Sequence, residues 1–180
     1  MNCSDKNAPI PVFLGLGSNR CYQGLEPVEL LYCACKSLSK KIQKITCSSV
    51  YKTKAMYYED QEDFHNMVVF GYFSGSAFEL LDFVDQIEAV FGRNRENEFR
   101  NGPRSLDVDI EFFGSEKIQT QDLQIPHPRI HERAFVLIPM LEILNESADC
   151  ININEKIYSD CLKQLDCKDV VRLKIPKFIL

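Results

Sequence analysis

The chain has 180 residues, of which 45% are hydrophobic and 26% charged, and this size and composition fit a single globular domain over residues 1–180. Its net charge of -5 argues against broad binding of nucleic acid, and no apolar run is long enough to span a bilayer. The first residues lack the features of a secretion signal, so we expect a cytoplasmic protein that binds neither nucleic acid nor membrane. The eight cysteines are then expected to be reduced and mostly buried.

The first half of the chain alternates between strand and helix patterns. Residues 11–19 form an apolar β-type run that closes in a Gly-Ser-Asn turn, and residues 25–42 have apolar positions at helical spacing. Residues 45–53 and 66–74 predict two strands that pair with each other. The loop between them is too long for a tight hairpin, and long loops in compact domains are often functional.

The second half repeats this alternation. Residues 76–91 predict an amphipathic helix that ends at Gly92, and residues 105–113 predict a strand. A Pro-flanked segment then leads into a helix that Pro139 is expected to break, and the tail after Asn145 predicts a strand, a helix and an edge strand. This order fits an α+β fold of the ferredoxin-like kind, an α/β sandwich in which helices pack on one face of a mainly antiparallel sheet.

Two aspartates in the strand 105–113 indicate a metal site. Asp107 and Asp109 are two residues apart, so their side chains project from one face of the strand while Val108 and Ile110 point to the other. Their Cα atoms are expected about 6.5 to 7 Å apart, close enough for both carboxylates to ligate one hard cation or to bridge two. The alternative is an ordinary polar strand face, because such pairs of aspartates are common.

Arginines gather just before these aspartates. Four of the eight in the chain lie between residues 93 and 104, namely Arg93, Arg95, Arg100 and Arg104. The planar guanidinium matches phosphate and carboxylate groups bidentately, so the cluster indicates an anion site, whereas the alternative is a solvated loop with scattered ion pairs. Together with the aspartates, the cluster predicts a site for Mg²⁺ and a polyphosphate that is not a P-loop.

Four segments resemble one enzyme family. NGPRSLDVDI, residues 101–110, resembles the signature of 6-hydroxymethyl-7,8-dihydropterin pyrophosphokinase of the folate pathway. FLGLGSN, SSVYKT with Asn66 thirteen residues further on, and IPHPRIHERAFVLIPMLEI resemble other segments of that family. The resemblance covers about residues 12–143 and implies transfer of pyrophosphate from ATP to the hydroxymethyl group of the dihydropterin, with release of AMP.

The resemblance also implies roles for individual residues. Asp107 and Asp109 would hold two Mg²⁺ ions together with ATP, and Arg93 and Arg104 would grip the phosphates. Phe64 and Phe135 would stack on the pterin, while Asn66 would read its edge. The remaining nucleotide positions are Glu88, Arg95, Ile110, His127 and Arg133, and the remaining pterin positions are Thr53, Lys54 and Met56.

Some of these residues could instead have purely structural roles. Glu88 could be an ion-pair partner on its helix, and both phenylalanines could be core residues. Asn101 stands where some relatives have a tryptophan, and Lys54 and Ala55 stand where prolines are frequent, and these departures concern substrate affinity rather than reaction type. The rival functions are another Mg²⁺-dependent phosphotransferase and a ferredoxin-like binding module without turnover. Relatives also occur fused to other folate-pathway enzymes, so a partner enzyme in the same chain is a further expectation.

Overall fold

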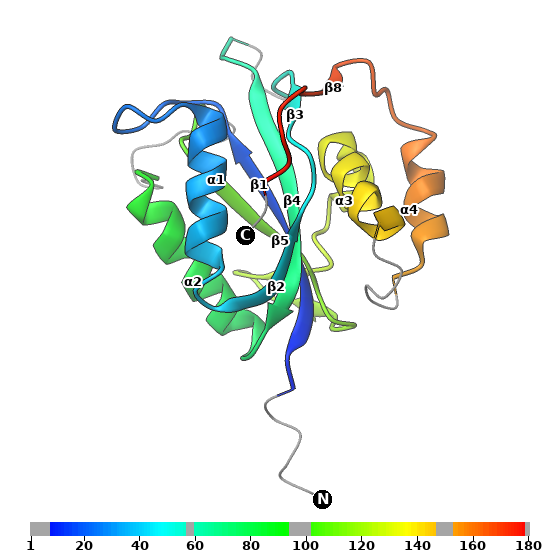
Figure 1. Ribbon diagram of the computed structural model, residues 1–180. Coiled ribbons are helices and arrows are strands. Elements are labelled where there is room, and N and C mark those ends of the chain that lie inside the picture. Colours follow the sequence, from blue (N-terminus) through cyan, green and yellow to red (C-terminus); the bar gives the residue numbers. More distant parts are fainter. Residues whose placement is uncertain (1–7, 57–59, 94–101, 147–152, 179–180) are drawn as a thin grey trace, which may run out of the picture.

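The computed structural model describes residues 8–56, 60–93, 102–146 and 153–178 (Figure 1). Its centre is a six-stranded antiparallel sheet in the order β5-β1-β4-β3-β8, with β2 also paired to β4. The strands of this sheet are β1 (Ile10–Ser18), β2 (Ile42–Cys47), β3 (Tyr51–Thr53), β4 (Phe64–Phe73), β5 (Asp107–Phe113) and β8 (Val170–Arg172). A small second sheet pairs β6 (Ile118–Gln119) with β7 (Gln124–Ile125).

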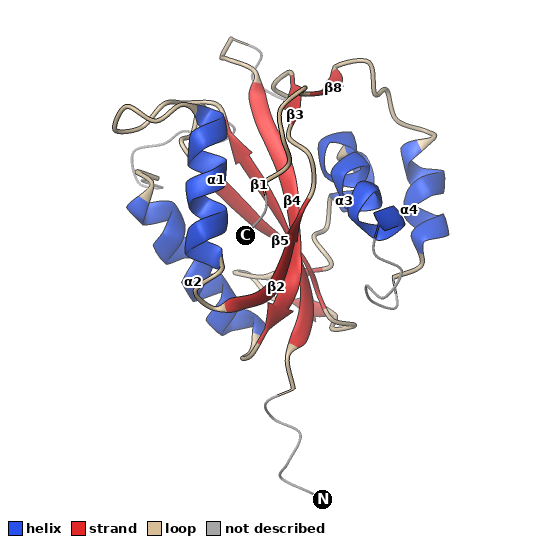
Figure 2. Cartoon of the chain, in the orientation of Figure 1, coloured by secondary structure: helices blue, strands red, loops and turns tan. Residues whose placement is uncertain are grey.

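Helices cover both faces of the large sheet (Figure 2). On one face lie α1 (Pro27–Leu38) and α2 (Ala77–Val90), and on the other lie α3 (Ala134–Glu146) and α4 (Glu155–Leu162), with a short 3₁₀ turn at Ile130–Glu132 before α3. The expectation that the helices pack on one face is therefore wrong. The reason is that β4 is apolar on both faces, since Met67 and Val69 face one core while Val68 and Phe70 face the other.

The helices on the first face begin at capping boxes. Ser76 Oγ accepts a hydrogen bond from the Glu79 backbone N–H, and Glu79 Oε2 accepts one from the Ser76 N–H, which satisfies two donors at the start of α2. The helix then buries Leu80, Val84 and Ile87 against the sheet. Each such side chain contributes about 1.5–3 kcal/mol when it leaves water.

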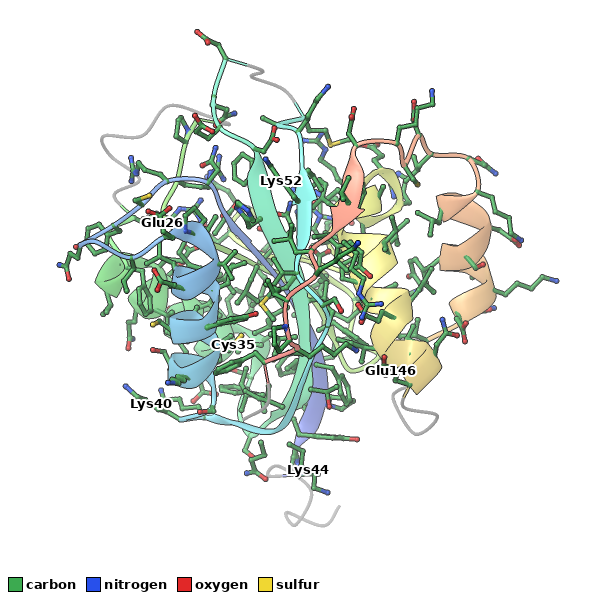
Figure 3. All side chains as sticks on the ribbon, turned by 45° about the horizontal axis from the view of Figure 1, so that its top comes forward. Glu26, Cys35, Lys40, Lys44, Lys52 and Glu146 are labelled. Atoms are coloured by element: carbon green, nitrogen blue, oxygen red, sulfur yellow. The ribbon has the colours of Figure 1, made fainter. Side chains whose placement is uncertain are left out.

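The core on the second face is largely aromatic. Phe13 of β1 lies 5.0 Å from Phe70 of β4 between ring centroids, and Leu137 and Met140 of α3 cover them. Pro139 lies inside α3 and does not break it, contrary to the expectation. Because Pro139 is buried, packing offsets the backbone hydrogen bond that a proline cannot donate. Figure 3 shows that side chains fill the space on both sides of the sheet.

Other local expectations are confirmed with small differences. The expected strand 45–53 is split, because β2 ends at Cys47 and β3 begins at Tyr51, with Ser48 Oγ accepting a hydrogen bond from the Val68 N–H between them. In the tail, the expected helix and edge strand are α4 and β8, and most of the expected first strand lies outside the described residues.

The structure also bears on the expectations about membrane spans and cysteines. Within the described ranges, no helix is long and apolar enough to cross a membrane. All six cysteines in those ranges are free thiols, but only Cys35 and Cys47 are buried, so the expectation of mostly buried cysteines holds for these two alone.

Candidate functional site

The candidate site lies where β5, β1 and β4 run side by side. Gly17 of β1 is paired with Asp107 of β5 on one side and with Asn66 of β4 on the other. Neighbouring strands are about 4.8 Å apart, so the backbones of the acid and the amide are separated by about 10 Å. A Cβ at Gly17 would lie 2.9 Å from Asn66 Oδ1, so only glycine leaves an open floor between them.

A pocket opens over this floor, against the start of α3. It gathers ten of the residues predicted from the sequence, namely Thr53, Lys54, Met56, Phe64, Asn66, Arg104, Asp107, Asp109, Arg133 and Phe135. These residues come from three strands, two loops and the start of a helix, so the fold joins the predicted phosphate and pterin positions in one cavity.

Asp107 is held by two arginines. Arg104 Nη1 lies 2.6 Å from Asp107 Oδ2, and Arg93 Nη1 forms an ion pair with Asp107 Oδ1. Burial tends to raise the pKa of the Asp107 carboxyl, but the guanidiniums of Arg93 and Arg104 outweigh it and hold this pKa below its ordinary value. The carboxylate is therefore ionised and oriented towards the pocket.

Glu88 joins α2 to this cluster. Glu88 is 1% exposed. Its Oε1 accepts a hydrogen bond from the Val108 N–H at 2.7 Å and also forms an ion pair with Arg93. The Arg93 N–H donates in turn to the Glu88 carbonyl oxygen. Glu88 thus forms an ion pair and does not line the pocket, and its role as a nucleotide contact stays a prediction.

Asp109 is held by one arginine from the other side of the pocket. Arg133 Nη1 lies 2.6 Å from Asp109 Oδ2, and the Arg133 guanidinium lies over the ring of Phe135 at 5.7 Å. His127 is nearby in the turn after β7, where burial lowers the pKa of its imidazole, opposed by Asp109. A neutral imidazole keeps one nitrogen as a hydrogen-bond acceptor and one as a donor.

Glu111 is a third acid on the same strand that the sequence patterns did not single out. It is 0% exposed and lines the pocket two residues beyond Asp109. Burial raises the pKa of its carboxyl well above the ordinary value, and Asp109 acts in the same direction while Arg133 opposes it. The signal that could have found it is the alternation itself, because residues 107, 109 and 111 share one face of a regular strand.

The part of the pocket that holds the residues expected to contact a pterin combines polar groups with aromatic side chains. Asn66 Nδ2 donates to Thr53 Oγ1 at 2.7 Å, and both residues are buried. Phe64 and Phe135 are half-buried and line the pocket, so each offers a ring to a flat ligand rather than lying wholly in the core. Lys54 and Met56 are exposed at the rim, where Lys54 Nζ lies 3.6 Å from Asp169 Oδ1.

Asn19 connects the two sides of the site and was also missed. Its Nδ2 donates to Gln61 Oε1 and to the Glu62 carbonyl, in the loop before β4. Its Oδ1 accepts from the Arg104 N–H at 2.8 Å, and its own N–H donates to the Arg104 carbonyl at 3.0 Å. The buried amide of Asn19 therefore links the loop before β4 to the segment that carries Arg104.

Four of the described predicted positions do not line the cavity, namely Glu88, Arg93, Ile110 and His127. The side chain of Ile110 belongs to the core under α1 and α2, as its alternation predicts, so only its backbone faces the site region. Arg95 lies outside the described residues, and so do Arg100 and Asn101.

Comparisons with known proteins agree with the sequence resemblance. The family model described as 7,8-dihydro-6-hydroxymethylpterin-pyrophosphokinase (HPPK) matches residues 13–145. A Bacillus subtilis protein named 2-amino-4-hydroxy-6-hydroxymethyldihydropteridine pyrophosphokinase is 48% identical over 99 residues, which cover 55% of this chain and 58% of that relative. A Haemophilus influenzae protein of the same name is 36% identical over 166 residues, covering 91% of this chain and 98% of the relative.

A solved structure extends the comparison to the fold. The crystal structure of wild-type Plasmodium falciparum HPPK-DHPS with STZ-DHP matches with a TM-score of 0.63 at 15% identity, and the match covers 94% of this chain and 47% of that one. The chain thus spans about half the length of that protein and 58% of the Bacillus subtilis relative. At this identity the likeness concerns the fold, and it agrees with the α+β class expected from the sequence.

Proposed function

Because the chain belongs to the 7,8-dihydro-6-hydroxymethylpterin-pyrophosphokinase family, we propose that it transfers pyrophosphate from ATP to 6-hydroxymethyl-7,8-dihydropterin and releases AMP. The observation that carries the proposal is the placement of Asp107 and Asn66 on opposite sides of Gly17. This arrangement sets a place for a cation and phosphates beside a place for a flat heterocycle, as a transfer between two substrates requires.

The residues on the first side fit Mg²⁺. Asp107 and Asp109 offer hard carboxylate oxygens from one strand face, with side chains that are 24% and 35% exposed. Within the described residues, no group of three or more His, Cys, Asp or Glu side chains could hold a metal ion. Two carboxylates suit Mg²⁺, which keeps several waters and takes its other ligands from substrate phosphates.

The two aspartates would therefore hold two Mg²⁺ ions with ATP. When bound, the ions neutralise charge on the phosphates and on the departing AMP. In the transfer itself, the hydroxyl oxygen of the pterin forms a bond to the β-phosphorus, and the bond from that phosphorus to the oxygen shared with the α-phosphorus breaks. AMP leaves with that oxygen, and the hydroxyl proton passes to solvent.

The arginines provide positive charge around this transfer. Arg93 and Arg104 in the free protein neutralise Asp107, which lines the pocket, so both arginines would be within reach of phosphate oxygens bound there. A guanidinium that binds both oxygens of a phosphate stabilises the charge that builds up during the transfer. Glu88 of α2 supports this arrangement because it pairs with Arg93 and accepts a hydrogen bond from the Val108 N–H at the start of β5.

On the second side, Thr53 and Asn66 would read the edge of the pterin while Phe64 and Phe135 enclose its faces. Their hydrogen-bonding groups are already oriented by the Asn66 to Thr53 bond, which lowers the cost of ordering them on binding. A fused folate-pathway partner, as in the HPPK-DHPS chain, stays an expectation for a longer version of this protein.

The deciding experiment is an assay of the full chain with ATP and 6-hydroxymethyl-7,8-dihydropterin, with Mg²⁺ and with a chelator, followed by chromatography of the nucleotides. We expect AMP and the pterin diphosphate in equal amounts, and neither product with the chelator. Formation of ADP in place of AMP would identify a different phosphotransferase, and binding of ATP without any product would identify an inactive module. Either result contradicts the proposal.

A further inference from the structure

Glu111 has a conformation that the proposed function leaves unexplained. Along β5 the register with β1 shifts, so that Phe13 faces Phe112, Leu14 faces Ile110, and Glu111 has no partner on β1. This is a β-bulge, a feature that occurs beside functional sites and redirects a side chain. Here Glu111 keeps the pocket face that it shares with Asp107 and Asp109, and the bulge shifts its neighbour Phe112 to that same face, where Phe112 packs in the core.

The backbone of Glu111 at the bulge also forms a hydrogen bond. Its carbonyl oxygen accepts a hydrogen bond from the His127 N–H at 3.0 Å, which fixes the turn that carries His127 against the edge strand. Opposite the side chain lies Gly15, where a Cβ would come within 2.9 Å of Glu111 Oε1. The fold therefore reserves space for this carboxyl group.

Within the described residues, both carboxyl oxygens of Glu111 are buried without a hydrogen-bond donor. A buried polar group without a partner is costly, and in native proteins it usually has a functional reason. A donor is close by: Arg133 Nη1 is 3.7 Å from Glu111 Oε1, while it bonds Asp109 Oδ2 at 2.6 Å. Arg133 Nε is likewise buried without an acceptor.

The Arg133 guanidinium thus lies between Asp109 and Glu111, and of these two acids it forms a hydrogen bond with Asp109 alone. Binding of a cation by Asp109, which the proposed function requires, would draw that carboxylate away from Arg133. A displaced, buried guanidinium needs another acceptor, because an uncompensated buried charge is strongly unfavourable. Glu111 is the acceptor already in place, and a movement of about 1 Å brings Nη1 from 3.7 Å to hydrogen-bond distance.

We propose that Glu111 is a positioning residue of the nucleotide site, which takes Arg133 over from Asp109 when Asp109 binds Mg²⁺ with the nucleotide. The inference rests on the proposed function only in assigning a cation to Asp109. Glu111 itself touches neither substrate nor metal. It acts through Arg133, which then presents its remaining N–H groups to the pocket.

The role predicts an unusual pair of effects for Glu111→Met, which keeps the volume of the side chain and removes both acceptors. In the free protein the carboxyl oxygens have no donor, so the melting temperature should stay the same or rise. The affinity for Mg²⁺ with an ATP analogue that has a methylene group between the α- and β-phosphorus should fall about tenfold or more, because Arg133 then competes with the cation for Asp109.

Calorimetric titration of the full chain and thermal unfolding measure these two effects. Glu116→Met, which changes an exposed acid just after the same strand, is the matched control and should change neither. Glu111→Gln retains one acceptor oxygen and should bind the magnesium nucleotide within about threefold of the parent. If Glu111→Met does not fold, Glu111→Asp takes its place, since it withdraws the carboxyl from Arg133 and should show the same loss.

A double-mutant cycle with Arg133→Met shows whether the effect passes through the arginine. We expect Glu111→Met to have little further effect in that background, because the competing guanidinium is gone. Unchanged affinity in the single variant, an equal loss in both backgrounds, or an equal loss in Glu111→Gln would overturn the inference.

Failure of the proposed function can be distinguished from failure of the inference about Glu111. If the parent binds the magnesium nucleotide but forms no AMP with the pterin, the activity is wrong and the binding comparison still decides on Glu111. A parent that binds no magnesium nucleotide overturns both.

Discussion

Arg104 Nη1 lies 2.6 Å from Asp107 Oδ2, so the acid expected to bind a cation is already paired with an arginine in the free protein. Arg93 holds the other oxygen of the same carboxylate, and Arg133 holds Asp109. A cation must displace these partners, whereas ATP offers the arginines phosphate oxygens in exchange. We therefore expect the site to bind metal and nucleotide together.

The first prediction concerns that coupling. Mg²⁺ alone should bind weakly, and its affinity should rise about tenfold or more with the methylene-bridged ATP analogue, since phosphates then accept the arginines that the carboxylates release. Calorimetric titration with and without the analogue measures this. Equal affinity in both titrations would mean that the arginines do not compete with the cation.

Asp107→Asn should reduce turnover by more than about 100-fold, the scale of a lost charge contact in a transition state. The amide keeps the shape of the side chain but cannot supply the anionic oxygen that a magnesium site needs. Initial rates of AMP release measure the loss. Asp82→Asn, on the exposed face of α2, is the control and should keep the parent rate; near-normal turnover in Asp107→Asn would remove the metal assignment.

Arg104→Ala should lower kcat more than it weakens nucleotide affinity. The reason is that Arg104 is partly satisfied by Asp107 before ATP binds, so its gain comes from charge that develops during the transfer. Steady-state kinetics and calorimetry with the methylene-bridged analogue separate the two quantities. A change confined to affinity would assign Arg104 to binding alone.

Asn66→Ala should weaken pterin binding by about tenfold or more, because the variant loses an edge contact and leaves the Thr53 hydroxyl buried without its donor. Binding of the magnesium nucleotide should change by less than about twofold, since β1 separates Asn66 from the acids. Fluorescence titration with a pterin and calorimetry with the nucleotide measure the two affinities. Gln119→Ala, an exposed change in β6, serves as the control, and parallel losses for both ligands would contradict separate sides.

Asn19→Ala should affect both substrates, unlike Asn66→Ala. The buried amide joins the Gln61 to Glu62 loop to Arg104 through three hydrogen bonds of its side chain. Its removal should lower the free energy of unfolding by about 1–3 kcal/mol and raise the KM for ATP and for the pterin together. Chemical denaturation and steady-state kinetics test this; a rise in only one KM would show that the loops are positioned independently.

The tail is attached through Glu142 of α3, which pairs with Lys177, and we expect this attachment to depend on pH. Glu142 accepts hydrogen bonds from the Ser49 N–H and hydroxyl, from the Tyr51 hydroxyl at 3.0 Å and from Lys177 Nζ. Burial opposes ionisation, but these donors outweigh it and lower the pKa of Glu142, while burial and Glu142 raise the pKa of Tyr51 to about 12. Figure 3 labels Glu146, a second partner of Lys177, at the end of the same helix.

Glu142→Gln should therefore lower the free energy of unfolding by about 1–3 kcal/mol at pH 7. A carboxyl with a lowered folded-state pKa stabilises the fold above its unfolded-state pKa of about 4.3, and this contribution is lost as the pH falls through the folded-state value. The difference between parent and variant should thus shrink in acid. Denaturation at several pH values measures it, with Glu155→Gln at the exposed start of α4 as the control; a constant difference would contradict an ionised Glu142.

The fold was predictable where local patterns decide it. The apolar run of β1, the helical spacing of α2 with its stop at Gly92 and the alternation of β5 all describe elements that the structure contains. The layering was not predictable in this way, because only the packing of Val68 and Phe70 under α3 shows that β4 is buried on both faces. The prediction that Pro139 breaks the helix was wrong for the same reason, because its burial offsets the local tendency of proline to end a helix.

The sequence by itself determined that Asp107 and Asp109 share a face, because residues two apart in a strand point the same way, and the four matched segments indicated the family. The tertiary structure alone decided what those acids meet. Gly17 lies between Asp107 and Asn66, Asn19 joins two loops, and Arg133 lies between Asp109 and Glu111. Each of these depends on the register between segments that are distant along the chain, and hydrophobic periodicity within a single segment carries no information about that register.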